Sequence, residues 1–299
     1  MASILLVHGR SRPLFGPAQM REQWLVALRS GFEAAGIDAP FADEDVRLPW
    51  YGDSLTHLVG GVTRAEAERV SLRGHLHAGE REFVLDVVVQ VARAYNFSAA
   101  QLAAVAAPDD EGAAPPSWGY VRTVLAAVDR YVPGMTGATV AFVARECYGY
   151  LTDTRLRQMI DDGVAGVVRA GEPTVVLAHS LGAVIAYHVL RAHPAGESWR
   201  IPLLVTLGAP LAWQAVITAL GRLEIRQFPR PVVNWVNARD PQDAVAIGGD
   251  LVGSLLPVGA GLPDVLEETG VVNPEDGRHA IEYYLADPLV AAHVARALG

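Results

Sequence analysis

The sequence contains one cysteine, Cys147, and no lysine. A single cysteine excludes a disulfide within the chain and fits a reducing compartment, so we expect a cytoplasmic protein. Cys147 lies in an apolar stretch, where a cysteine more often packs than reacts. The 24 basic residues are all arginine, which we interpret as codon bias and not as a functional signal.

Long apolar runs are missing as well. The chain has no run of about 18 or more uncharged apolar residues, although 51% of its residues are hydrophobic. Its first residues lack a basic segment and enter an expected strand at once, so we predict neither a signal peptide nor a membrane span. The net charge of −9 argues against nucleic acid or an anionic membrane as the main partner.

The most informative stretch spans residues 174–192. Residues 174–178 are β-branched and apolar, which is typical of a buried parallel strand, and residues 183–192 form an apolar, alanine-rich helix. A serine at the tight corner between them, Ser180, projects its hydroxyl above the sheet beside the helix N-terminus. Backbone N–H groups there can stabilise a developing oxyanion. Ala178 and Gly182 supply the small residues that close packing at this corner requires.

The remaining chain alternates between strand and helix patterns. We predict further strands at residues 3–7, 38–47 (weak), 201–207, 231–236 and 270–273, and helices at residues 18–35, 211–220 and 281–298. This alternation is typical of an α/β fold with a doubly wound, mostly parallel sheet.

One connection is far longer than the fold needs. Residues 54–171 comprise about 118 residues, whereas a crossover between parallel strands needs only a dozen or so. We therefore predict a single domain, residues 1–299, with a mostly helical insertion at residues 54–171. Helical spacing within the insertion is clearest at residues 81–95, 120–131 and 155–170.

Residues 178–182 resemble the nucleophile elbow, G-x-S-x-G, of the α/β-hydrolase superfamily, with Ala178 in place of the first glycine. The resemblance implies an α/β-hydrolase fold with Ser180 as nucleophile. His8-Gly9 resembles the strand end that precedes the second oxyanion donor, which implies an oxyanion hole made by the backbone N–H groups of Arg10 and Leu181. Alternatively, His8-Gly9 simply turns the chain. The insertion resembles the lid of lipases and esterases, or else is a structural cover.

The family places its acid in the loop after the strand at residues 231–236, where Asp240 and Asp243 compete. The segment that begins at Asp243, Asp-Ala-Val-Ala, looks like the family's Asp-Pro-Val form, so we prefer Asp243. A turn residue before Pro241 is the alternative role for Asp240.

The family keeps its base in the loop before the last helix, and His279 stands there. The other two candidates, His188 and His293, lie inside predicted helices. The chain order Ser180, Asp243, His279 is the α/β-hydrolase order.

Two other groups of residues are candidate ligand sites. Trp50 and Tyr51 follow the weak strand, so they are expected at the carboxyl edge as substrate-binding residues, or else as packed aromatics of a surface turn. His75 and His77 alternate without a third ligand at suitable spacing, so we expect a solvated loop and no metal. The implied mechanism needs no organic cofactor.

Together these features predict a serine hydrolase that cleaves a small-molecule carboxylic ester through an acyl-enzyme, as esterases and lipases do. A thioesterase, an acyltransferase or a peptidase would use the same three residues. A non-catalytic binding protein on this fold is the alternative from a different class. The substrate and the oligomeric state are not predictable from the sequence.

Overall fold

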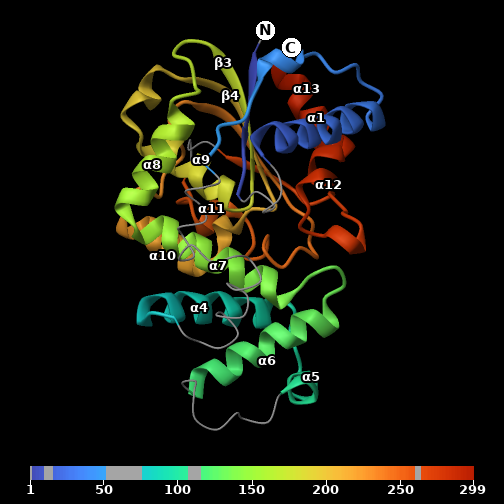
Figure 1. Cartoon of the computed structure of the whole chain (residues 1–299), viewed down its shortest axis with the longest axis vertical. Helices are drawn as coiled ribbons and strands as arrows, with labels where there is room; N and C mark the ends of the chain where they lie inside the picture. Colours follow the sequence, from blue (N-terminus) through green and yellow to red (C-terminus); the bar gives the residue numbers. More distant parts are fainter. Residues whose placement is uncertain (1, 10–15, 52–75, 107–115, 260–263) are drawn as a thin grey trace.

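The computed structural model describes residues 2–9, 16–51, 76–106, 116–259 and 264–299. Within these residues the protein is an α/β structure with a six-stranded parallel sheet and helices on both faces (Figure 1). The strand order is β2-β1-β3-β4-β5-β6, and every neighbouring pair is parallel. The predicted α/β class with a parallel sheet is confirmed.

The strands form where β-branched and apolar residues are continuous, because both faces of the sheet are covered. Their bounds are β1 (Ser3–Val7), β2 (Val46–Arg47), β3 (Pro173–His179), β4 (Arg200–Leu207), β5 (Val232–Ala238) and β6 (Val265–Glu268). Two predicted strands differ. The weak strand at residues 38–47 is reduced to β2 after a short 3₁₀ turn (Asp43–Asp45), and the last strand is β6 instead of residues 270–273.

Alternate residues of each strand pack on opposite faces, as the pleat requires. In β1, Ile4 and Leu6 join a core formed with α1 (Pro17–Ala34), α12 (Ile281–Ala286) and α13 (Pro288–Leu298). Leu5 and Val7 join the larger core on the other face, formed with α8 (Thr154–Ala165), α9 (Leu181–Ala192) and α10 (Gln214–Arg222).

The chain reverses its direction of travel across the sheet between β1 and β3. It runs from β1 to β2 at one edge, and then returns past β1 to β3, β4, β5 and β6. In open parallel sheets such a switch point leaves a crevice beyond the carboxyl ends of the two central strands, where ligands bind. His8 and Ser180, which directly follow β1 and β3, stand at this point.

The described part of the insertion builds a helical layer next to the sheet domain. It contains α4 (Ala78–Ala94), α5 (Ala99–Val105), α6 (Pro116–Tyr131), α7 (Gly137–Thr152) and α8. Figure 1 shows α4, α5 and α6 on the side of α7 that faces away from the sheet. The helix α7 packs on α4, α6, α8, α9 and α10, so it connects this layer to the core. No described helix is both long and apolar enough to cross a bilayer.

Candidate active site

The corner after β3 holds Ser180 in a backbone conformation that side-chain-bearing residues rarely adopt. Its φ and ψ angles are 55° and −129°, and such strain costs about 1–3 kcal/mol and persists only where surrounding contacts impose it. Here the Ser180 N–H donates to Leu207 O at 3.1 Å, which extends the sheet ladder by one residue. A Cβ at Gly182 would lie 2.2 Å from Val7 O, so only glycine lets α9 start this close to β1.

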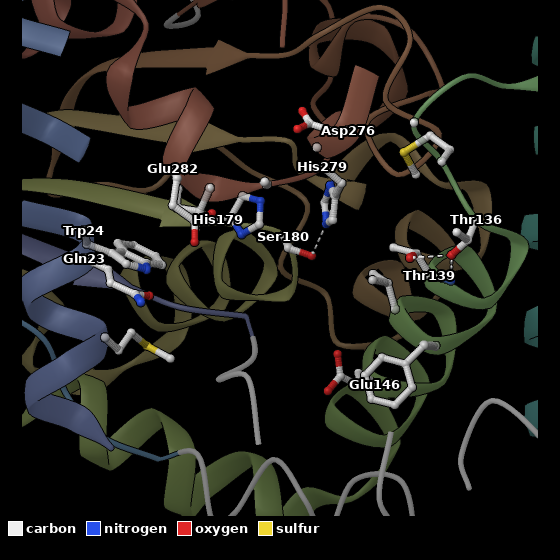
Figure 2. Close-up of a pocket in the computed structure, with 18 residues that line it drawn as sticks. Gln23, Trp24, Thr136, Thr139, Glu146, His179, Ser180, Asp276, His279 and Glu282 are labelled. Carbon is white, nitrogen blue, oxygen red and sulfur yellow. Dashed lines mark hydrogen bonds between the residues drawn. The ribbon is translucent and has the colours of Figure 1, made fainter. Parts of the chain in front are cut away.

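A chain of hydrogen bonds runs from Ser180 through His279 to Asp243. Ser180 Oγ lies 2.9 Å from His279 Nε2, and Figure 2 shows the two side chains facing each other. His279 Nδ1 lies 2.7 Å from Asp243 Oδ2. An ionised carboxylate can only accept, so Nδ1 carries the proton and Nε2 is left to accept the serine O–H. The three residues chosen from the sequence are therefore brought together in one hydrogen-bonded set.

The two aspartates that competed for the acid position have different partners. Asp243 is fully buried, and besides His279 it accepts from Val245 N–H at 2.9 Å through Oδ1. Asp240 is also buried, but Oδ2 of its carboxylate lies 3.1 Å from Arg278 Nη1. Asp240 Oδ1 accepts from Gln242 N–H at 2.7 Å, the bond expected of a turn aspartate. Of the two aspartates, only Asp243 has a described contact with His279.

Of the two residues predicted to form an oxyanion hole, Leu181 is described. Leu181 is the first residue of α9, so its N–H belongs to the helix N-terminus that faces the serine. Gly9, two residues after β1, lies against the backbone of His179 and Leu181 and the Cβ of Ser180. The residue that ends the described part of the chain after β1 therefore lies beside the serine corner. Arg10, the other predicted donor, lies outside the described residues.

Ser180 and His279 open into a cavity of about 370 Å³ (Figure 2). One wall comes from α1 with Met20, Gln23 and Trp24, and residues 276–277 and 279–282 line the cavity around His279. The opposite wall comes from the insertion, with Met135, Thr136, Thr139, Phe142, Val143 and Glu146. The insertion resembles a lid in its sequence, which implies that it covers the site. It does reach the cavity, and its wall carries two threonines and a carboxylate as well as apolar side chains.

Trp50 and Tyr51 are not among the described residues that line this cavity. The Tyr51 ring stacks on His8 with centroids 4.1 Å apart, and its hydroxyl donates to His8 O at 2.5 Å. The Trp50 ring lies 5.6 Å from the same imidazole. Both aromatics pack on His8, which directly follows β1 and is fully buried. In the described part of the chain both rings contact His8, and their role as substrate contacts stays a prediction.

Two buried histidines stay neutral near the site. Burial lowers the pKa of His8 to about 3. Burial, and then the nearby His279, lower the pKa of His179 well below its usual value, and the rings of His179 and His279 lie 4.7 Å apart. A neutral His179 spares the neighbouring imidazole the repulsion of a second positive charge.

Other reactive groups are arranged differently. Cys147 is fully buried in α7, and burial raises the pKa of its thiol well above the usual value, which opposes a role as nucleophile. The described residues contain no group of three histidine, cysteine, aspartate or glutamate side chains suited to a metal ion, and His75 lies outside the described residues.

Comparison of the chain with protein-family models, with curated proteins and with solved structures gave no match. The functional argument therefore rests on the geometry of the site.

Proposed function

We propose that the protein is a serine hydrolase that cleaves a carboxylic ester through an acyl-enzyme, with Ser180 as nucleophile, His279 as base and acid, and Asp243 as the residue that orients His279. The observation that supports this proposal is the chain of two hydrogen bonds, of 2.9 Å from Ser180 Oγ to His279 Nε2 and of 2.7 Å from His279 Nδ1 to Asp243 Oδ2. The same three residue types in the same relation activate a serine in unrelated folds.

In the first half of the reaction, Ser180 Oγ attacks the carbonyl carbon while its proton passes to His279 Nε2. The imidazolium then carries a positive charge that the Asp243 carboxylate stabilises. The N–H of Leu181 stabilises the oxyanion of the tetrahedral intermediate. When the intermediate collapses, the bond to the leaving alcohol breaks, and the alkoxide takes the proton from Nε2.

In the second half, water replaces the alcohol. His279 Nε2 takes a proton from the water as its oxygen bonds to the acyl carbon, and returns the proton to Ser180 Oγ as the acid leaves. A cavity of about 370 Å³ with Met20, Trp24, Phe142 and Val143 in its walls suits a compact apolar acyl or aryl group.

Labelling with a fluorophosphonate, followed by peptide mapping, tests this proposal. We expect one labelled peptide, with the phosphonyl group on Ser180, and hydrolysis of p-nitrophenyl butyrate. Ser180→Ala should lose both. The control Ser30→Ala removes an exposed hydroxyl that donates only within α1, to Val26 O, and should retain both. Retained hydrolysis in Ser180→Ala would falsify the proposed nucleophile.

The choice among acyl substrates is decided by the same assay with an ester, a thioester and an amide of one acyl group, each with and without an added alcohol. Hydrolysis of the ester at the highest kcat/KM is the expected result. Preference for the thioester, for the amide or for transfer to the alcohol would reassign the protein to another acyl-transfer activity of the same three residues.

A further inference from the structure

One buried phenol joins the acid loop, residues 239–246, to the helix that follows His279. Tyr284 lies on α12 and is fully buried. Its hydroxyl donates to Asp243 Oδ2 at 2.9 Å and accepts from the Asp240 N–H at 3.1 Å. A single hydroxyl thus bonds to both aspartates of the loop, one through its carboxylate and the other through its backbone.

The phenol and the imidazole share one carboxylate oxygen. Asp243 Oδ2 accepts from His279 Nδ1 at 2.7 Å and from Tyr284 at 2.9 Å, while Oδ1 accepts from Val245 N–H. These three donors come from different positions around the carboxylate. Rotation of the carboxyl group would break more than one bond, so the oxygen that orients His279 is held in place.

The end of β4 leaves room for this arrangement. Gly208 has a φ of +53°, and a Cβ there would lie 2.9 Å from Tyr284 Cε2 and 3.0 Å from Asp243 Oδ2. A side chain at this position would displace the ring or the carboxylate. The glycine in Thr-Leu-Gly-Ala-Pro therefore has a local role, which is to let Tyr284 and Asp243 approach each other across β4.

The backbone around this contact is fixed by an ion pair. Asp240 Oδ2 lies 3.1 Å from Arg278 Nη1 and accepts from Asn273 N–H at 2.9 Å. The side-chain Nδ2 of Asn273 donates to Arg278 O at 2.8 Å. Since Arg278 directly precedes His279, the loop that carries the base is tied to the loop that carries the acid. Tyr284 connects this fixed backbone to the Asp243 carboxylate, because its hydroxyl bonds to both.

We propose that Tyr284 is a positioning residue, which sets the orientation of Asp243 and through it the imidazole of His279. This inference rests on the proposed function. A positioning role differs from simple packing in one measurable respect. It affects proton transfer by His279 and leaves the substrate cavity unchanged, because Tyr284 is not among the described residues lining it. Turnover should therefore fall while KM stays the same.

The test compares Tyr284→Phe with Tyr187→Phe. The control removes an equally buried hydroxyl, which donates to Ile225 O at 2.7 Å and does not contact the acid loop. For Tyr284→Phe we expect a kcat on p-nitrophenyl butyrate at least about 10-fold lower, KM within about twofold, and a parallel decrease in the rate of fluorophosphonate labelling. For Tyr187→Phe we expect a kcat and labelling rate close to those of the unmodified protein. Melting curves of both variants restrict the comparison to folded protein.

Three results would count against the inference. An unchanged kcat and labelling rate in Tyr284→Phe would overturn it, and so would an equal decrease in Tyr187→Phe, since loss of any buried hydroxyl would then explain the effect. In either case Ser180 of the unmodified protein would still be labelled, and the proposed function would stand. If the unmodified protein is neither labelled nor active, the proposed function fails and this inference fails with it.

Discussion

Two sides of the site are held together in different ways. We call the strand ends and loops that carry Ser180, His279 and Asp243 the sheet wall, and the side formed by α7 the insertion wall. The sheet wall is held by polar contacts. Hydrogen bonds join Ser180, His279 and Asp243, and the buried Asp240–Arg278 ion pair lies beside them. On the insertion side, α7 is held mainly by apolar contacts with α4 and α6. Its own buried ion pair, Arg145 with Glu80 at 2.6 Å, joins α7 to α4.

This difference has a functional consequence. Directional contacts fix atoms to within tenths of an ångström, which proton transfer needs, whereas apolar packing tolerates exchange of side chains of similar volume. We infer that the sheet wall carries the chemistry and that the insertion wall carries substrate choice. Changes on the sheet wall should alter turnover or stability, and changes on the insertion wall should alter preference.

The largest effect should come from Asp243→Asn. The amide can donate to His279 Nδ1 and so stabilise the wrong tautomer, in which Nε2 carries the proton and cannot accept from Ser180. We expect kcat to fall by about 10⁴-fold with little change in the melting temperature. The measurement is steady-state hydrolysis of p-nitrophenyl butyrate together with a thermal melt.

Asp240→Asn is the matched control for this substitution, because it is the same change three residues earlier in the same loop. It leaves Arg278 buried without its carboxylate, and removing one member of a buried pair costs about 3–5 kcal/mol of folding free energy. We expect a lower melting temperature and a much smaller loss of kcat in the folded protein. A larger loss of kcat in Asp240→Asn than in Asp243→Asn would show that Asp240 is the acid.

Much of the sheet wall could be predicted from the sequence because each of its parts has a local signal. The runs in β1, β3 and β4 are continuous and apolar, and the small residues around Ser180 mark a close-packed corner. The prediction of the last strand at residues 270–273 instead of at β6 was wrong for a physical reason. The strand β6 is an edge strand whose Leu266 is half exposed, and two of its four residues are glutamates. Glu267 accepts from Asn237 Nδ2 at 2.7 Å, a long-range contact without a sequence pattern.

The insertion wall was harder to predict. The helix α7 is buried on most sides, including Arg145 and Glu146, so it lacks the one-sided apolar stripe that reveals a surface helix. Thr136 and Glu146 line the cavity without any motif to mark them. Tyr284 was missed as well. Its position five residues after His279 indicates nothing by itself, because the contact with Asp243 forms only when the fold brings α12 next to the acid loop.

The next largest effect is expected from acid, which should lower the free energy of unfolding through the buried histidines of the sheet wall. His8 is neutral in the folded protein because its pKa is lowered from 6.5 to about 3, so below pH 6.5 the unfolded chain binds more protons than the folded chain. Stability therefore falls as the pH falls from 6.5 towards 3, by about 1.4 kcal/mol per pH unit, or about 2 kcal/mol at pH 5. The lowered pKa of His179 acts in the same direction.

Urea unfolding at pH 7 and pH 5 measures this dependence. In His8→Phe we expect the difference between the two pH values to shrink by about 2 kcal/mol, since the titrating group is gone. The control His77→Gln removes an exposed histidine and should leave the difference unchanged. An equal dependence in His8→Phe and the unmodified protein would show that groups other than His8 cause the acid sensitivity.

The smallest effect is expected on the insertion wall. Val143 lines the cavity and Val140, three residues earlier on α7, is buried away from it, so Val143→Ala and Val140→Ala are the same change on two sides of one helix. Val143→Ala enlarges the space beside Ser180.

The expected gain follows from the acyl chain that fills this space. Because a buried methylene is worth about 0.8 kcal/mol, one extra methylene in the acyl chain should gain about fourfold in kcat/KM relative to the shorter ester. The ratio of kcat/KM for p-nitrophenyl pentanoate to that for the butyrate should therefore rise in Val143→Ala and stay constant in Val140→Ala, although both variants lose stability. An equal ratio in the two variants would mean that α7 does not contact the acyl chain, and substrate preference would then have to be set by the α1 wall with Met20 and Trp24.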